Sequence, residues 1–312
     1  MGLRLGSRGS PLARWQANHV AERLRSAWPG LLVDIVIIKT EGDRRAGLPS
    51  PASFGKGIFV KEIEDALLQG TIDLAVHSLK DLPTETPAGL TLAAIPERYD
   101  ARDALICRTA RRITDLPPNA LVATGSPRRR CQLLHARKDL RFTHLRGNVD
   151  TRLRKLDEGQ FDALILAVAG IERLGLTDAP YEPIPFSLCL PAPGQGALAI
   201  EIRADDATTR RHVGPLDDGG TARCVAAERA FLATLSAGCL APAGALATIA
   251  GDTLALDAMV GTPDGRELKR DRLEGAVSEA EALGSVLAQR LLAAGGDAIL
   301  REVRDADRSG GS

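Results

Sequence analysis

The sequence predicts an α/β fold for about its first 200 residues and a separate small α+β domain for its last third. In the first part, short apolar runs alternate with segments of helical periodicity, which is typical of α/β proteins. From about residue 217 the pattern changes to one helix, three short strands and a closing helix. A chain of 312 residues is long enough for two or three domains.

The chain is expected to begin with a strand, a helix and a second strand. Residues 3–6 form the first apolar run, and Ser10 and Pro11 then supply an N-cap and a proline at the first helical position. Residues 32–39, rich in Val and Ile, predict the next strand. The polar stretch 41–57 that follows is long for a loop in a compact domain. Such loops are often mobile lids, although a passive connection would have the same composition.

Strands and helices continue to alternate as far as residue 202. Residues 181–193 are rich in proline and predict an irregular segment, and the Gly-Gln-Gly sequence at 194–196 predicts a hinge. The expected strands are 72–76, 91–95, 104–107, 121–124, 141–145, 163–168 and 197–202, and the expected helices are 59–68, 127–136 and 149–158.

The last third predicts an antiparallel meander between two helices. Turn sequences at 251–252 and 263–265 separate its strands. The expected helices are 221–235 and 278–294, and the expected strands are 245–249, 254–260 and 267–273. The Gly-, Ser- and charge-rich tail from residue 305 to 312 is expected to be disordered.

The charge balance argues against a general nucleic-acid binder. The 40 Lys and Arg residues are matched by 40 Asp and Glu residues, whereas phosphate binding normally needs a basic excess. Five cysteines without CxxC spacing disfavour a disulfide framework or a zinc site. The N-terminus lacks the apolar core of a signal peptide, and no run of about 18 apolar residues is present. We therefore expect a cytoplasmic protein.

Arginines gather at the predicted turns between strands and helices. Arg128, Arg129 and Arg130 follow a strand and open a helix, where backbone amides and the helix dipole favour anions. Guanidinium groups bind carboxylates and phosphates through paired donors. Similar turns carry Arg8, Arg146, Arg152 and Arg173. The pattern predicts a site for a multiply charged anion, although a solvated helix face would also explain each cluster by itself.

An acidic residue follows the buried strand at 72–76. Pro83 holds Leu82 extended, so Asp81 is expected in a turn beyond the carboxyl end of that strand, where ligands bind in α/β sheets. The neighbouring Lys80 favours the ionised form of Asp81. An ionised carboxylate suits stabilising a developing cation or accepting a proton, but a surface ion pair would have the same sequence.

A cysteine and a lysine lie on two further loops. Cys239 lies on a constrained loop between Gly238 and Pro242, and it is either a small buried residue or a nucleophile and covalent attachment point. Lys56, flanked by two glycines, could close over a ligand, although the segment lacks the spacing of a phosphate loop.

Ten segments, taken together and in order, resemble the porphobilinogen deaminase (hydroxymethylbilane synthase) family. The segments are residues 8–13, 40–43, 55–62, 75–83, 98–103, 128–133, 145–152, 167–173, 191–196 and 238–239. The resemblance implies an enzyme of tetrapyrrole (haem) biosynthesis, a transferase that condenses four porphobilinogen molecules with loss of ammonia into linear hydroxymethylbilane. It also implies a covalent dipyrromethane primer, joined through a thioether to the cysteine that matches Cys239.

The resemblance also assigns roles to other residues. Asp81 matches the catalytic carboxylate that stabilises positive charge on the pyrroles. The positions that match carboxylate-binding residues are Arg8, Ser10, Lys80, Thr124, Ser126, Arg128, Arg129, Arg146, Arg152 and Arg173. Lys56, Phe59 and Gln195 match substrate-side residues, and the loop at 41–57 matches a flexible flap.

The implied fold has two lobes like those of periplasmic binding proteins and a small C-terminal α+β domain with a three-stranded antiparallel sheet. The expected domains are 1–96 with 197–214, then 102–190, then 219–304. The expected partners are porphobilinogen and oligopyrrole intermediates, with no metal, nucleic acid or membrane, and the family is usually monomeric. A non-catalytic anion-binding module built on the same lobes is the alternative, and a thiol hydrolase is less favoured because no histidine is placed as a partner.

Overall fold

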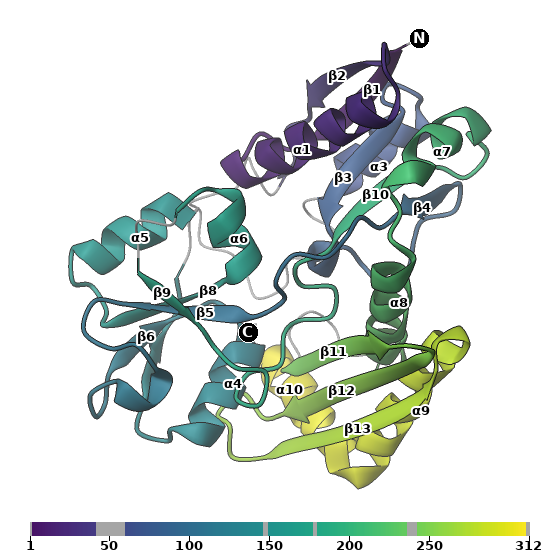
Figure 1. Ribbon diagram of the computed structural model, residues 1–312. Helices are drawn as coiled ribbons and strands as arrows, with labels where there is room; N and C mark the ends of the chain where they lie inside the picture. Colours follow the sequence, from purple (N-terminus) through teal and green to yellow (C-terminus); the bar gives the residue numbers. More distant parts are fainter. Residues whose placement is uncertain (1, 42–59, 146–148, 177–179, 236–241, 310–312) are drawn as a thin grey trace. The chain divides into compact units, whose positions relative to one another are not determined.

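The computed structural model describes residues 2–41, 60–145, 149–176, 180–235 and 242–309 (Figure 1). The described residues form two compact units, which are presented separately below. The first contains residues 2–41, 60–99 and 196–223, and the second contains 100–195 and 224–309.

A five-stranded mixed sheet forms the centre of the first unit. Its order is β2-β1-β3-β10-β4, with β1 parallel to β2 and β3, and β10 antiparallel to β3 and β4. The strands are β1 (Gly2–Ser7), β2 (Leu32–Ile37), β3 (Leu74–Ser78), β4 (Leu90–Ala94) and β10 (Leu198–Arg203). The helices are α1 (Pro11–Ala27), α3 (Lys61–Leu68) and α7 (Ala207–Val213), with the single 3₁₀ turns η1 (Leu79–Asp81) and η3 (Gly214–Leu216).

The alternation of side chains along β3 determines how the helices pack on this sheet. Leu74 and Val76 belong to one buried cluster with Val20 of α1, whereas Ala75 belongs to another cluster with Ile63 of α3. Successive residues of a strand point to opposite faces, so α1 and α3 cover different faces of the sheet. The end of β3 is therefore held between two helices.

The second unit contains a sheet with the same arrangement. Its order is β7-β6-β8-β5-β9, with β6 parallel to β7 and β8, and β5 antiparallel to β8 and β9. The strands are β5 (Asp103–Cys107), β6 (Leu121–Ala123), β7 (Arg141–Thr143), β8 (Ala163–Ala167) and β9 (Tyr181–Pro183), and the helices are α4 (Pro127–Ala136), α5 (Val149–Asp157) and α6 (Val168–Arg173), with the 3₁₀ turn η2 (Ile113–Asp115). Two lobes of matching topology confirm the predicted fold class.

The first helix of each lobe begins with the same Ser-Pro pair. The Ser10 hydroxyl accepts the backbone N–H of Ala13 at 3.3 Å, and the Ser126 hydroxyl accepts that of Arg129 at 3.4 Å. The proline that follows each serine needs no helical N–H bond, because its nitrogen has no hydrogen. The sequence alone did not reveal this repeat, since two short motifs 116 positions apart have no fixed period.

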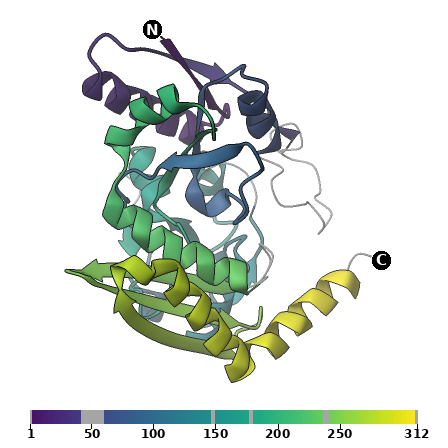
Figure 2. The same ribbon diagram turned by 90° about the vertical axis from the view of Figure 1, so that its right-hand side faces the viewer.

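The second unit also contains the predicted three-stranded antiparallel sheet. Its order is β11-β12-β13, and α8 and α9 lie side by side against it (Figure 2). The elements are β11 (Ala243–Ala250), β12 (Thr253–Gly261), β13 (Leu268–Ala276), α8 (Gly219–Thr234), α9 (Ala280–Leu291) and α10 (Asp297–Ser309), with the 3₁₀ turn η4 (Val277–Glu279) and the π-helical turn η5 (Leu292–Gly296). A Cβ atom on Gly284 of α9 would collide with the backbone of Ala227 in α8, so glycine permits this close packing.

Some elements differ from the sequence-based expectation. Helices α6 and α7 were not predicted because each is short, and β9 lies in the segment expected to be irregular. The tail expected to be disordered from residue 305 instead continues α10 to Ser309. That helix has a buried face containing Ile299 and Leu300, which outweighs its polar composition.

The turn between β12 and β13 packs closely against α4. The carbonyl of Gly265 lies 3.0 Å from Nδ1 of His135, and Gly265 adopts a positive φ of 71°. A Cβ atom at this position would lie 2.6 Å from the carbonyl oxygen of Cys131 and 2.7 Å from the backbone nitrogen of His135. The glycine therefore fixes α4 against the third sheet.

We predict that Gly265→Ala destabilises the protein by about 3 kcal/mol, since it adds steric overlap to the strain of a left-handed backbone. Gly251→Ala is the matched control, because Gly251 also has a positive φ, of 59°, but a Cβ atom there meets nothing within 4 Å. The control substitution should lower the free energy of unfolding by only about 1–2 kcal/mol. Urea unfolding of both variants measures the difference, and equal losses would contradict close packing of the turn on α4.

Candidate active site

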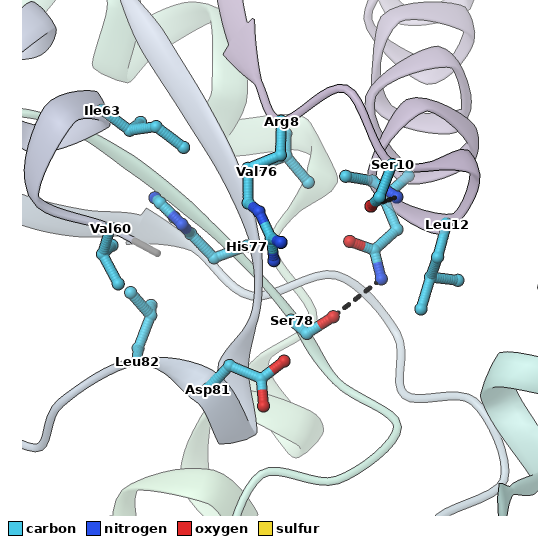
Figure 3. Close-up of a pocket in the computed structure, with 12 residues that line it drawn as sticks. Arg8, Ser10, Leu12, Val60, Ile63, Val76, His77, Ser78, Asp81 and Leu82 are labelled. Carbon is cyan, nitrogen blue, oxygen red and sulfur yellow. Dashed lines mark hydrogen bonds between the residues drawn. The ribbon is translucent and has the colours of Figure 1, made fainter. Parts of the chain in front are cut away.

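The first unit contains a pocket at the carboxyl ends of β1 and β3 (Figure 3). This is the edge of an α/β sheet where ligands bind. The cavity has a volume of about 90 Å³. It is lined by Arg8, Ser10, Leu12, Ala13, Gln16, Val60, Ile63, Val76, His77, Ser78, Asp81 and Leu82.

The pocket brings together three residues that the sequence singled out. Arg8 lies on the loop after β1, Ser10 caps α1, and Asp81 ends the η1 turn. In Figure 3 the side chains of Arg8 and Asp81 approach the same space from these two segments. A cation and an anion therefore face one small cavity. Lys80 is half-buried on the same turn.

Asp81 lies in a turn beyond its strand, as expected. The η1 turn is one 3₁₀ turn, and Leu79 is buried beneath it. Leu82 is extended, with φ −77° and ψ 139°, which agrees with the restriction imposed by the following Pro83. Asp81 itself is exposed, so its carboxylate is accessible from the pocket.

Sequence reasoning missed the polar residues that support this pocket. The Gln16 amide donates a hydrogen bond of 2.8 Å to the Ser78 hydroxyl and so joins α1 to the end of β3. Nε2 of the buried His77 lies 3.1 Å from a carboxylate oxygen of Glu201, which is 1% exposed. Burial raises the pKa of nearby Glu64, and the charge of Glu201 raises it further. One feature of the sequence pointed to this buried polar contact, namely Glu201, a charged residue inside an apolar strand.

We predict that His77→Leu destabilises the protein much more than Glu201→Gln. The first change leaves the buried Glu201 side chain without its hydrogen-bond partner, at a cost of about 3 kcal/mol. The second keeps an acceptor for the imidazole and should cost about 1 kcal/mol. Chemical denaturation measures both values. A loss below 1 kcal/mol for His77→Leu would show that the pair does not hold β3 and β10 together.

The second unit gathers the predicted arginines at one edge of its sheet. Helices α4, α5 and α6 follow the parallel strands β6, β7 and β8, so all three begin at the carboxyl edge. Arg128 and Arg129 lie in α4, Arg152 in α5 and Arg173 at the end of α6. The sequence predicted that these arginines lie at turns between strands and helices, and the parallel pairing of β6 with β7 and β8 brings those turns to one edge.

A buried carboxylate pairs with both arginines of α4. The Oδ2 atom of Asp103 lies 2.7 Å from Nη1 of Arg128, and its Oδ1 atom lies 2.7 Å from Nη2 and 2.9 Å from Nε of Arg129. Arg128 also donates to the carbonyl of Leu190 at 2.5 Å, and Arg129 to that of Ile165 at 3.0 Å. Burial alone would raise the pKa of Asp103, but the two guanidinium charges outweigh it and hold the pKa well below its ordinary value.

Arg128, Arg129 and Asp103 carry two positive charges and one negative charge. Two guanidinium groups share one carboxylate, and Arg152 lies close enough for the charge of Arg129 to act on it. Burial, and then repulsion from Arg129, lower the pKa of Arg152. Arg173 is 4% exposed. A carboxylate-bearing ligand would offset this charge.

Neighbouring predicted residues shape the turn that starts α4. The Thr124 hydroxyl accepts the N–H of Ser126, and the Ser126 hydroxyl caps the helix. Arg130 is exposed. Gln195, expected on the substrate side, is 1% exposed, and its amide donates to Asp103 Oδ1 at 2.9 Å and to the Ala101 carbonyl at 2.8 Å.

Other predicted residues lie outside the described part of the chain, namely Lys56, Phe59, Arg146 and Cys239. The cysteines that the structure does describe are all buried, and they are Cys107, Cys131, Cys189 and Cys224. Burial raises the pKa of both Cys131 and Cys189 to about 12. These two thiols stay protonated and are poor nucleophiles.

Comparison with known proteins decides the family. The sequence model described as "Porphobilinogen deaminase, dipyromethane cofactor binding domain" matches residues 3–211, and the one described as "Porphobilinogen deaminase, C-terminal domain" matches residues 222–293. The chain belongs to the porphobilinogen deaminase family. The resemblance found in the sequence is thereby confirmed.

Curated relatives match almost the whole chain. The porphobilinogen deaminase of Pelobacter propionicus is 50% identical over 301 residues, which cover 96% of this chain and 97% of the relative. That of Geobacter metallireducens is 48% identical over 96% of this chain and 94% of its own length. Among solved structures, a nutrient binding protein from Burkholderia cenocepacia bound to methionine is 14% identical, with a TM-score of 0.43 over 68% of this chain and 89% of its own.

The described residues contain neither a membrane-spanning helix nor a metal-binding cluster. None of the helices in this part of the chain has the length and apolar character needed to cross a bilayer. In the same residues, no cluster of three or more His, Cys, Asp and Glu side chains is arranged to hold a metal ion.

Proposed function

We propose that the chain is a hydroxymethylbilane synthase, a transferase of tetrapyrrole biosynthesis. It condenses four porphobilinogen molecules stepwise, with loss of ammonia, into linear hydroxymethylbilane. The observation that carries this function in a member of the family is the pocket where the Asp81 carboxylate and the Arg8 guanidinium face one cavity. The first group suits a cation that develops on a pyrrole, and the second suits a carboxylate of the same substrate.

The arginine cluster fits the dipyrromethane group that the family carries. Such a group bears several carboxylates, and Arg128 and Arg129 together carry one more positive charge than the Asp103 carboxylate that they share. Arg128 donates to Asp103 and to the Leu190 carbonyl through Nη1 alone. Among the described residues, none accepts a hydrogen bond from its Nε and Nη2 atoms, which form the edge that binds a carboxylate through two bonds.

The dipyrromethane, when bound, supplies the pyrrole carbon to which the substrate is joined. The protein contributes binding and charge stabilisation around that step. Loss of ammonia from porphobilinogen leaves positive charge shared with the pyrrole nitrogen, and the exposed Asp81 carboxylate accepts the pyrrole N–H and stabilises this charge. Charge-assisted hydrogen bonds of about 1.5–3 kcal/mol each hold the substrate carboxylates on the arginines.

Cys239 is the proposed attachment point. The family motif assigns it, and the chemistry of the other thiols supports the assignment. Cys131 and Cys189 are buried with pKa values of about 12, so neither forms the thiolate that attachment requires.

The remaining assignments follow from the family and are proposals as well. Lys56, Phe59 and Gln195 act on the substrate side, and Arg146 joins the carboxylate-binding arginines. The three domains comprise 1–96 with 197–214, then 102–190, then 219–304. We also propose that the protein acts in the cytoplasm as a monomer, without a nucleic-acid or membrane partner.

Intact mass under denaturing conditions tests the proposed function. Protein expressed with porphobilinogen available should retain the added mass of a dipyrromethane. The Cys239→Ser variant should show the polypeptide mass alone, whereas Cys131→Ser, which changes a buried thiol, should keep the addition. Wild-type protein with no added mass would contradict the enzyme and favour a non-catalytic anion-binding module.

We predict that Asp81→Asn lowers kcat at least about 100-fold while KM for porphobilinogen changes little, because a neutral amide stabilises the developing cation poorly. Glu85→Gln removes an exposed carboxylate four residues away and is the control. Steady-state kinetics of the loaded enzyme gives both parameters. Turnover of Asp81→Asn equal to that of the control would remove Asp81 from the mechanism.

A further inference from the structure

We propose that Asp103 is a positioning residue that orients Arg128 and Arg129 for the carboxylates of the ligand. This inference rests on the proposed function and assigns a role to a residue that the described chemistry does not use. Asp103 begins β5, which runs antiparallel to β8, so the residue lies at the same sheet edge as the start of α4. Its side chain is fully buried.

The hydrogen bonds around Asp103 fix both guanidinium groups before any ligand arrives. Arg128 is held through one nitrogen by Asp103 and the Leu190 carbonyl. Arg129 is held by two bonds to Asp103 and one to the Ile165 carbonyl. Three separate segments therefore restrain the two side chains. Restraint of this kind lowers the entropy lost when a ligand binds.

The hydrogen bonds to Asp103 also give the two arginines different roles. Arg129 presents its Nε and Nη2 edge to Asp103, so that edge is already occupied by a carboxylate. Arg128 gives Asp103 only Nη1, and its Nε and Nη2 edge is left for a carboxylate of the ligand. Arg128 then binds the ligand directly, and Arg129 chiefly holds Asp103 and adds positive charge.

The carboxylate of Asp103 is itself held in place. Gln195 donates its amide to Oδ1 at 2.9 Å, and Cys189 lies 3.5 Å from Oδ2. Gln132 supports the same region by donating to the Leu190 carbonyl at 3.0 Å. A carboxylate with several donors keeps one orientation, which is what a positioning role requires.

Replacing Asp103 by Asn distinguishes the effect of side-chain orientation on ligand binding from the effect of net charge. The change makes the cluster more positive, so attraction alone would bind a polyanionic ligand more tightly. It also places an amide donor against a guanidinium or removes one accepting oxygen, so the arginines lose their fixed orientation. Positioning therefore predicts weaker binding despite the added positive charge.

The experiment uses apoprotein given porphobilinogen, with the appearance of the dipyrromethane mass followed in time. Asp103→Asn should load roughly 10- to 100-fold more slowly than wild type, as expected for losing charge-assisted hydrogen bonds. Once loaded, it should show a raised KM for porphobilinogen. Val122→Ala, a change in a fully buried apolar residue of β6, is the control for lost stability and should load at the wild-type rate.

The outcomes distinguish this inference from the proposed function. Loading of Asp103→Asn at or above the wild-type rate, with an unchanged or lower KM, would overturn the positioning role. Failure of the wild-type protein to load would instead overturn the proposed function.

A measurement on wild-type protein tests the geometry without depending on the folding of a variant. In ¹⁵N-arginine-labelled protein, the Nε–H of Arg129 should exchange with water much more slowly than that of Arg154, whose side chain is 64% exposed. Equal exchange rates would show that Asp103 does not hold Arg129, and the inference would fail.

Discussion

The ion cluster of Asp103, Arg128 and Arg129 is the interaction on which the arginine-rich edge of the second lobe depends. Buried guanidinium groups are costly unless each finds a partner, and one shared carboxylate gives both a partner while leaving positive charge over. The cluster also joins β5 to α4, so the charge is fixed to the sheet. A carboxylate of an anionic ligand would neutralise the positive charge that Asp103 leaves on the two arginines.

Both lobes have the same local arrangement at one edge of their sheets. In each sheet the first parallel strand leads through a Ser-Pro cap into a helix, and an antiparallel strand begins at the same edge. In the first lobe this edge carries the pocket with Arg8 and Asp81. In the second lobe it carries the arginines. The first lobe therefore carries an exposed carboxylate at this edge, and the second lobe carries a group of arginines at the corresponding edge.

Local sequence signals predicted much of this structure. The caps at Ser10 and Ser126, the strands with β-branched residues and the turns of the third sheet depend on nearby residues, so their positions could be inferred. The clustering of arginines at turns predicted an anion site, and the family resemblance supplied the roles that we propose for Asp81 and Cys239. Short elements such as α6 and β9 were missed because their stability comes from packing.

The partners of charged residues could not be inferred from the sequence. Asp103 and Arg128 are 25 positions apart, and His77 and Glu201 are 124 apart, so neither pair leaves a local pattern. Each buried pair forms only when the fold brings two distant elements together, a strand and a helix in the first case and two strands in the second. From the sequence, Arg128 and Arg129 therefore had the same expected role, whereas the structure pairs the Nε and Nη2 edge of Arg129 with Asp103.

A crystal structure of the protein loaded with its dipyrromethane would test the central claim most directly. We expect a ligand carboxylate within hydrogen-bonding distance of Nε and Nη2 of Arg128, while Asp103 keeps its bonds to Nη1 of Arg128 and to Arg129. Ligand carboxylates directed to solvent, with that edge of Arg128 bound to protein or water, would contradict it.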